Sequence, residues 1–444
     1  MTQPFYQVLI CLLAGIVTIV LLTTKLRVHP FFALLIASLV VGLGVQIPLA
    51  DVINLMKEGF GNIMRSLGLI IVLGTTLGVL LEQSGSTRVM ATFILKKIGR
   101  KYPALAMSVT GFIVGLPLFC DSGFIVLSGL NVSLAKKTGT RVIIMAVSMA
   151  TGLYSVHCLI PPHPGAAAAA GIIGVEYGKL VLAGIIIAIP AMLVGYFYAG
   201  YAGKKMIVDE HTEEEVTDMH KHTKLPSTIQ AFLPVLLPVL LIASRSFLVS
   251  GPAPSGGLML LVSSLGDPVV ALSIGIIFAF NGVRPWQKDT LNPWLQEAAE
   301  KAGSILVIIG AGGAFGAVLS ATHIGQHFSE VLPLAGMGIL FPFLLTFILK
   351  TAQGSSTVAI ITAASIIQPL LPALGLTTPD GRLLCVLSMG AGSMMISHAN
   401  DAYFWVIARF EKLEMQPMLK VYSVATVLMG LVSFLMVYIF SLLL

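Results

Sequence analysis

The sequence predicts an all-α polytopic membrane protein, built as an inverted-topology repeat of two halves with re-entrant hairpins or broken helices near the middle of the membrane. Three observations support this prediction. Of the 444 residues, 56% are hydrophobic and only 10% are charged, whereas about a quarter of the residues of a soluble domain are charged. Apolar runs of membrane-spanning length recur along the chain. The two halves also share a sequence pattern.

The apolar runs are long enough to cross a membrane as helices. A hydrocarbon core of roughly 30 Å requires about twenty helical residues, and we expect about twelve membrane segments in this chain. The clearest runs are residues 8–22, 33–45, 67–81, 180–198, 232–243, 269–280, 305–319 and 424–444. The first is expected to be a span rather than a cleaved signal peptide, because no basic stretch precedes Phe5 and no small-residue cleavage site follows before Lys25.

A polar stretch divides the chain near its middle. Residues 204–228 contain acids, lysines and three histidines, a composition typical of a solvated loop. We therefore expect a first repeat half over residues 1–203 and a second, inverted half over residues 229–444, each with about six membrane segments. Residues 204–228 would join them as a cytoplasmic linker.

The two halves resemble each other at an offset of about 240 positions. The recurring pattern is an arginine, an SMxxG segment and a histidine, present as Arg141, residues 148–152 and His157 and again as Arg382, residues 388–392 and His398. Basic clusters such as residues 88–101 are expected in the cytoplasm, whereas the matching loop, residues 321–333, has no Lys or Arg. Matching elements would then lie on opposite sides of the membrane, which predicts an inverted repeat with both termini in the periplasm.

Charge and cysteine usage exclude several classes of protein. The net charge of +6 does not indicate nucleic-acid binding, because the basic residues lie in short clusters between apolar runs. The four cysteines lack CxxC spacing, so we expect neither a disulfide framework nor a metal site.

The Gly-rich stretch at residues 310–316 lacks the Lys-Ser/Thr of an ATP-binding P-loop. A membrane hydrolase would need a ligand pair such as HExxH, and two prolines separate His157 from His163. We expect no cofactor and no catalytic residues.

Two matching stretches interrupt the apolar pattern with polar and helix-breaking residues. They are GLPLFCDSGF at residues 115–124 and KTAQGSST at residues 350–357. Non-helical backbone at membrane depth persists only where protein or water satisfies it, so both stretches predict hairpin tips or helix breaks. The helices that begin near Phe124 and Val358 would point their N-termini at these breaks, which suits the binding of a carboxylate.

Two acids lie within or beside such interruptions. Asp121 belongs to the first stretch, and Asp401 ends the stretch SHAND at residues 397–401. An acid inside a membrane is costly unless it is paired or hydrated, so both are the leading candidates for proton binding. The alternative for each acid is a permanent partner, for instance Lys350 or Arg409.

Further polar residues of these stretches are candidates for binding a substrate or passing protons. The hydroxyl groups can bind a hydroxylated ligand or can cap the following helices. His157 and His163, beside two adjacent prolines, can relay protons near neutral pH or hydrogen-bond to carbonyls freed at a broken helix. The complete set of candidate substrate contacts is Asp121, Ser122, Gly354, Ser355, Ser356, Thr357, His398 and Asn400.

The segments LPLFCDSGF, HCLIPPHPG, GSSTVAIITAASI and SHANDAYFW resemble the gluconate permease family of bacterial gluconate:proton symporters, over nearly the whole chain. The resemblance implies uptake of gluconate, or of idonate, fructuronate, glycerate or D-serine, driven by the proton gradient. It also implies kinship with the wider ion-transporter superfamily, whose members often work as dimers, so a homodimer in the bacterial inner membrane is expected. Gluconate-type members have Phe-Tyr-Glu or Phe-Phe-Glu in place of Phe119-Cys120-Asp121 and a hydrophobic residue in place of Ser122, which leaves the substrate open among these acids.

These features together predict a secondary active transporter that imports a small hydroxy-carboxylate by proton symport with alternating access. The carboxylate would lie between the two broken segments, and a proton on Asp121 or Asp401 would couple uptake to the gradient. Sodium coupling is an alternative, because backbone carbonyls at paired hairpins also suit Na⁺. A channel or sensor without coupled transport is a further alternative, and it predicts no accumulation against a gradient.

Overall fold

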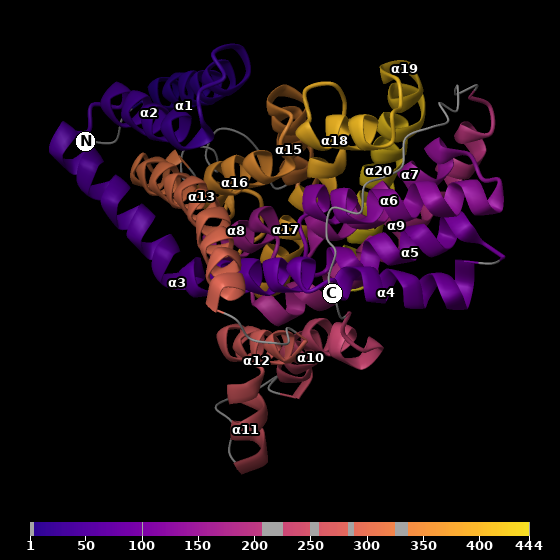
Figure 1. Ribbon diagram of the computed structural model, residues 1–444. Coiled ribbons are helices and arrows are strands. Elements are labelled where there is room, and N and C mark those ends of the chain that lie inside the picture. The colour runs from indigo at the N-terminus through magenta and orange to yellow at the C-terminus, as the bar shows by residue number, and fades with distance from the viewer. Residues whose placement is uncertain are drawn as a thin grey trace.

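The chain folds almost entirely into helices, as the computed structural model shows (Figure 1). The structure describes residues 4–99, 101–206, 225–248, 257–282, 288–324 and 336–443. No β-strand occurs within these ranges, which confirms the predicted all-α class. Most of the expected linker at residues 204–228 and most of the loop at residues 321–333 lie outside the described residues.

The first half of the chain contains nine α-helices among its described residues. They are α1 (Phe5–Val20), α2 (Pro30–Gly44), α3 (Leu49–Gln83), α4 (Ser86–Ile94), α5 (Pro103–Gly115), α6 (Cys120–Thr138), α7 (Val142–Leu159), α8 (Pro164–Ile173) and α9 (Tyr177–Gly203), with π-helical turns η1 (Leu21–Lys25) and η2 (Leu95–Gly99). Proline occupies the first position of α2, α5 and α8, where a helix needs no N–H group. Left-handed Gly139 and Gly174 end α6 and α8.

Helices of the second half begin in the same way, with proline at the first position of α12 and α17. The described helices of this half are α10 (Thr228–Leu248), α11 (Gly257–Leu265), α12 (Pro268–Asn281), α13 (Lys288–Ala321), α15 (Leu340–Gln353), α16 (Ser356–Ile367), α17 (Pro379–Met394), α18 (Ala402–Phe410), α19 (Met415–Met418) and α20 (Val424–Leu443), with short turns η4 (Gln368–Leu370) and η5 (Leu419–Ser423). Asp267 caps α12 by accepting a hydrogen bond from the Val269 amide at 2.9 Å, ahead of Pro268.

The helices differ in whether they can cross a membrane. Seven described helices are long and apolar enough, or eight if the bent pair of α11 and α12 is one span. Other apolar helices are shorter, and α15 and α16 have 14 and 12 residues. At 1.5 Å per residue they cover about 21 and 18 Å, less than a hydrocarbon core of roughly 30 Å. Some of the expected membrane segments are therefore too short to cross the hydrocarbon core alone.

The helices of the two halves pack against each other. In Figure 1, α3 and α13 lie against each other on the left, α1 and α2 lie above them, and α10 to α12 form the lower extension. The remaining helices of both halves pack together from the centre to the right, where α16 contacts α8, α17 contacts α7, and α18 contacts α6. One hydrophobic cluster draws side chains from both halves.

Each of the four interruptions predicted from the sequence is a break between helices. Residues 116–119 separate α5 from α6, residues 160–163 separate α7 from α8, residues 354–355 separate α15 from α16, and residues 395–401 separate α17 from α18. Among the described residues, two of these four breaks lie in each half, ahead of the long helix α9 or α20. This order supports an internal repeat, and the inverted orientation of the halves stays a prediction.

Candidate functional site

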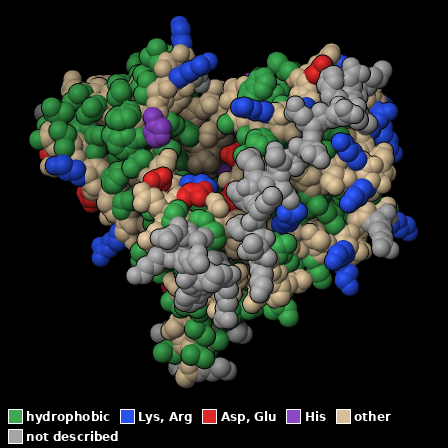
Figure 2. Space-filling model, viewed as in Figure 1, with side chains coloured by type: hydrophobic (Ala, Val, Ile, Leu, Met, Phe, Trp, Pro, Cys, Tyr) green, Lys and Arg blue, Asp and Glu red, His purple; other side chains and the backbone are tan. Residues whose placement is uncertain are grey.

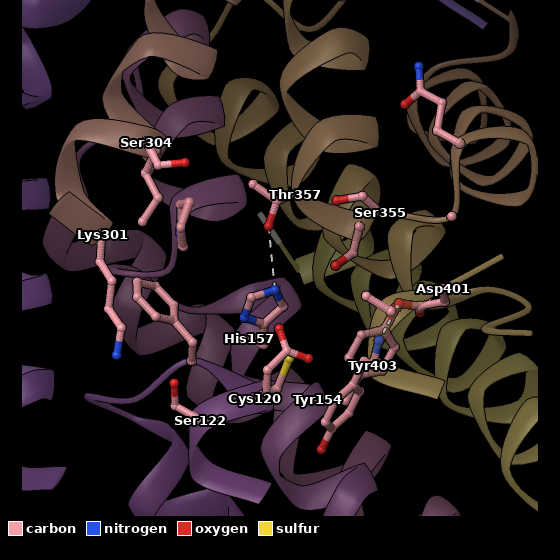
Figure 3. A pocket seen from close by; sticks show the side chains of 18 of the residues that line it. Cys120, Ser122, Tyr154, His157, Lys301, Ser304, Ser355, Thr357, Asp401 and Tyr403 are labelled. Atoms are coloured by element: carbon pink, nitrogen blue, oxygen red, sulfur yellow. Dashed lines mark hydrogen bonds between the residues drawn. The ribbon is translucent and has the colours of Figure 1, made fainter. Parts of the chain in front are cut away.

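The broken helices converge on a cavity of about 460 Å³. Its walls come from residues 119–122, 353–357 and 400–403, with side chains added from α7, α8 and α13. Figure 2 shows this face of the molecule hollowed near its centre, with acidic and basic side chains gathered below the hollow. Figure 3 shows Lys301 and Ser304 on one side of the cavity and Ser355 and Asp401 on the other.

Helix N-termini make the cavity receptive to an anion. The helices α6, α8, α16 and α18 all begin at residues that line it or adjoin its lining, and free N–H groups and the helix dipole favour negative charge at such points. Two of these ends are capped: Ser355 Oγ accepts from the Val358 amide at 3.3 Å, and Asp401 Oδ1 accepts from the Tyr403 amide at 3.0 Å. The start of α6 has no side-chain cap, so its amides are available to a ligand.

Asp401 is held in a buried ion pair. Its Oδ2 lies 2.7 Å from Lys350 Nζ, and the Lys350 side chain is fully buried. Ser397 Oγ donates to the same carboxylate, and Lys350 also donates to the Gly354 carbonyl. Of the two partners considered for Asp401, the structure therefore selects Lys350, and this pair ties the break after α15 to the break after α17.

Gly354 and Asn400 complete the junction between these two breaks. Gly354 has a φ of 81°, a conformation that favours glycine, and a Cβ atom there would overlap the carbonyl oxygen of Asn400. The Asn400 side chain donates to the Thr351 carbonyl at 2.7 Å. Gly354 therefore serves close backbone packing at the cavity wall, and Asn400 presents its remaining polar surface there.

Asp121 has no such partners. It lies in the first turn of α6, is half-buried, and forms no hydrogen bond or ion pair with the described residues. Its Oδ1 is buried without a hydrogen-bond partner in that part of the chain. A carboxyl group in this position can change its charge without breaking an existing contact.

The predicted histidines divide between the cavity and its surroundings. His157 lines the cavity, with Nε2 3.4 Å from Thr357 Oγ1 (Figure 3) and its ring stacked on Tyr154. His163 lies behind it, with Nε2 2.8 Å from the carbonyl oxygen of Gly115 at the end of α5, the structural role that was the alternative for it. Neither His163 nor His398 lines the cavity. The other predicted contacts, Asp121, Ser122, Gly354, Ser355, Ser356, Thr357 and Asn400, all do.

Several cavity residues were not predicted. Lys301 and Ser304 come from α13, and Tyr154 and Tyr403 stack on each other with ring centroids 5.8 Å apart. Lys301 Nζ lies 2.6 Å from Glu297 and 3.7 Å from Glu82. The only signal in the sequence is the i,i+4 spacing of Glu297 and Lys301, which marks a helix but not a cavity.

Gln353 lies between this cavity and a second one of about 340 Å³. Gln353 and Ser355 line both cavities, and the second is otherwise lined by Thr23, residues 27–30 and Val358. The side-chain oxygen and nitrogen of Gln353 are both buried without a hydrogen-bond partner among the described residues. The turn between α15 and α16 therefore forms part of the wall of both cavities.

Broken helices around a polar cavity within a multi-pass helical body are typical of membrane transport proteins. The chain belongs to the GntP family of permeases, which it matches over residues 7–443. This result confirms the resemblance inferred from the sequence. The family relationship makes the protein a transporter rather than an enzyme.

Relatives with known names match almost end to end. The inner membrane permease YgbN of Escherichia coli K12 is 31% identical, over 97% of this chain and 98% of the relative. The high-affinity gluconate transporter of the same organism is 32% identical, over 94% and 95% of the two chains. The D-serine transporter DsdX, also from that organism, is 31% identical, over 95% of each chain.

Solved structures of other transporters share the fold. The YdaH transporter of Alcanivorax borkumensis aligns with a TM-score of 0.63 and 14% identity, over 89% of this chain and 90% of that one. MtrF of Neisseria gonorrhoeae aligns with a TM-score of 0.62 and 18% identity, over 87% and 83% of the two chains. These matches support the predicted polytopic architecture.

Proposed function

We propose that this protein imports a small hydroxy-carboxylate, such as gluconate or a related sugar acid, by proton symport with alternating access. The observation that carries the proposal is a single cavity that combines helix N-termini, Lys301 and an unpaired acid, Asp121. The names of relatives that carry gluconate support the substrate class.

The substrate carboxylate fits the uncapped start of α6 and the nearby positive charge of Lys301. Its hydroxyl groups fit the polar side chains that line the rest of the cavity, which are Ser122, Gln353, Ser355, Ser356, Thr357 and Asn400. Charge selects the carboxylate, and the hydroxyl-binding groups select among acids.

Proton coupling follows from the charge of Asp121. An ionised Asp121 would repel a carboxylate bound in the same cavity, and a proton on Asp121 removes the repulsion. Substrate and proton therefore bind together more favourably than either binds alone. His157 lines the same cavity and is the candidate relay, whereas Asp401 is paired with Lys350 and joins the two breaks.

Alternating access requires that the bound substrate meet one aqueous side at a time. The two cavities on either side of Gln353 and Ser355 support this part of the proposal. Movement of the turn between α15 and α16 would transfer a ligand from one cavity to the other without opening a continuous pore. A channel would need both cavities connected at once.

A small amino acid such as D-serine is the second candidate substrate. The observation that favours it is the combination of Lys301 and the unpaired Asp121 in one cavity, because a zwitterion presents both a carboxylate and an ammonium group. The named D-serine relative supports this candidate. In this case an ionised Asp121 attracts the substrate.

For the cellular arrangement we propose a homodimer in the bacterial inner membrane with both termini in the periplasm. The name of the relative YgbN supports the membrane. The basic clusters around Arg88 and Lys136 support the orientation, because such clusters stay in the cytoplasm. Labelling of single cysteines near each terminus with a membrane-impermeant maleimide tests the orientation in intact cells.

The deciding experiment is uptake of labelled gluconate into proteoliposomes in sodium-free buffer, with and without an inward proton gradient, in competition with unlabelled hydroxy acids and D-serine. We expect accumulation that collapses when the gradient is dissipated, and the best competitor identifies the substrate. Accumulation that requires sodium would show that sodium, rather than the proton, is the coupling ion. Equilibration without accumulation under every gradient would contradict symport and support a channel.

A further inference from the structure

A second buried acid lies well away from the cavity. Glu411 follows the last residue of α18, and its side chain is 5% exposed. Its Oε1 accepts a hydrogen bond of 2.8 Å from Nδ2 of Asn131, which lies on α6 and is fully buried. Glu411 forms no ion pair with the described residues. The two residues are 280 positions apart in sequence and join the two halves of the chain.

Each side chain of this pair has one further polar atom that lacks a hydrogen-bond partner. Glu411 Oε2 and Asn131 Oδ1 are each buried without a hydrogen-bond partner among the described residues. Both atoms are acceptors if Glu411 is ionised, so they cannot satisfy each other. If Oε2 carries a proton, it becomes a donor complementary to the acceptor Asn131 Oδ1, while Oε1 still accepts from Nδ2. A single proton would therefore complete a cyclic acid–amide pair.

The surroundings of Glu411 also favour the neutral form. In sequence, Glu411 is flanked by the charged residues Arg409, Lys412 and Glu414, and Lys136 and Lys137 lie in the last turn of α6. All five are exposed, and Lys350, beside Asp401, is the only lysine or arginine buried among the described residues, so no such cation is buried beside the Glu411 carboxyl group. A buried carboxylate without a cation is costly, and neutralisation is the usual outcome.

The pair occupies a defined place relative to the transport cavity. Asp121 and Asn131 lie ten residues apart on α6, as Asp401 and Glu411 do along α18, so the pair lies about 15 Å beyond the cavity. Between them α6 and α18 pack through Phe124 and Tyr403, whose ring centroids are 6.1 Å apart. The far ends of both helices carry the exposed basic residues that are expected at the cytoplasmic face.

We propose that Glu411 is a second proton-binding residue of the transporter, protonated and paired with Asn131 in this conformation, and deprotonated to the aqueous phase beside the basic ends of α6 and α18 during the cycle. The proposal rests on the proposed proton symport. The only chemical change is the transfer of one proton between Glu411 and water, so no further reactant is needed. Its role is distinct from that of Asp121, because Glu411 does not line the cavity.

The test uses Glu411→Gln, which preserves the acid–amide geometry with a permanently neutral side chain, because Gln Nε2 can donate to Asn131 Oδ1. The matched control is Glu414→Gln, the same change at an exposed position three residues away. In proteoliposomes we expect Glu411→Gln to keep substrate exchange without a gradient but to lower gradient-driven accumulation about tenfold, within the usual range of coupling between two sites. The control should match the unaltered protein.

A spectroscopic measurement tests the protonation state independently of transport. Infrared spectra of the unaltered protein at neutral pH should show a carbonyl band of a protonated carboxylic acid that Glu411→Gln removes and Glu414→Gln retains. If Glu411→Gln does not fold, Glu411→Asp should shift the band instead. An unaltered band in these variants would overturn the acid–amide pair.

The transport outcomes separate the two proposals. Normal accumulation by Glu411→Gln, or loss of both exchange and accumulation by a folded variant, would overturn a coupling role for Glu411. Failure of the unaltered protein to accumulate any substrate under a proton gradient would instead sink the proposed symport, while the infrared band would still report on the pair.

Discussion

Asp121 and Asp401 lie in the walls of the same cavity, yet their surroundings differ completely. Asp401 is bound by Lys350, Ser397 and the Tyr403 amide. Asp121 has no hydrogen bond or ion pair among the described residues, and one of its oxygens is buried and unsatisfied. The sequence presents both as acids in apolar surroundings, and only the tertiary contacts distinguish them. A paired acid stabilises the structure, whereas an unpaired acid can change its charge without losing a contact.

The largest expected effect comes from breaking the pair on the Asp401 side. Lys350→Met should leave Asp401 buried without its cation and should lower the free energy of unfolding by about 3–5 kcal/mol. Thermal unfolding in detergent measures the change, with Lys57→Met at an exposed position as the control. Addition of Asp401→Asn to Lys350→Met should recover part of the loss. Unchanged stability in the single variant would show that the ion pair between Lys350 and Asp401 does not stabilise the fold.

The second prediction concerns Asp121. Asp121→Asn should reduce proton-driven accumulation at least about tenfold, because the site can no longer exchange a proton, whereas exchange without a gradient persists. Its thermal stability should match that of the unaltered protein, because no contact is lost. Asp51→Asn, at an exposed position, is the control. Full proton-dependent accumulation by Asp121→Asn would show that another group binds the coupling proton.

Lys301 tests whether charge attracts the substrate into the cavity. Its side chain is 32% exposed and shares its charge with Glu297 and Glu82, so we expect a modest effect. Lys301→Gln should weaken the apparent affinity for a carboxylate substrate by up to about fivefold, as for a partly screened ion pair. Competition binding measures this change, with Lys57→Gln as the control. An unaltered affinity would show that helix N-termini alone attract the carboxylate.

The smallest effect is expected at the hydroxyl groups of the turn before α16. Ser355→Ala removes the N-cap and should lower stability by about 1 kcal/mol. The combination with Ser356→Ala should also weaken substrate binding, because both side chains line the cavity. Direct binding assays alongside thermal unfolding separate the two effects. A loss of stability with unchanged affinity would assign both serines to helix capping.

Local sequence predicted much of the fold and of the site. Prolines, glycines and polar residues identified all four breaks, because such residues disrupt helices wherever they occur in a chain. All eight predicted substrate contacts lie at or beside these breaks, and all but His398 line the cavity. Backbone chemistry is a local property, so a single sequence reveals it.

Contacts between distant segments could not be predicted in this way. Lys301 reaches the cavity because α13 packs along α3, and nothing in its local sequence shows that packing. His163 turns towards the Gly115 carbonyl rather than into the cavity, and Asn131 meets Glu411 from the other half of the chain. The choice of Lys350 over Arg409 as the partner of Asp401 was likewise decided by tertiary structure.

The most direct test of the proposed coupling is proton movement driven by substrate alone. Proteoliposomes with a trapped pH-sensitive dye, in sodium-free buffer without an imposed gradient, would receive gluconate from outside and, separately, the best competitor from the uptake panel. We expect acidification of the interior by the unaltered protein and by Asp51→Asn, but not by Asp121→Asn. Substrate entry without acidification by the unaltered protein, or equal acidification by Asp121→Asn, would contradict the proposed coupling.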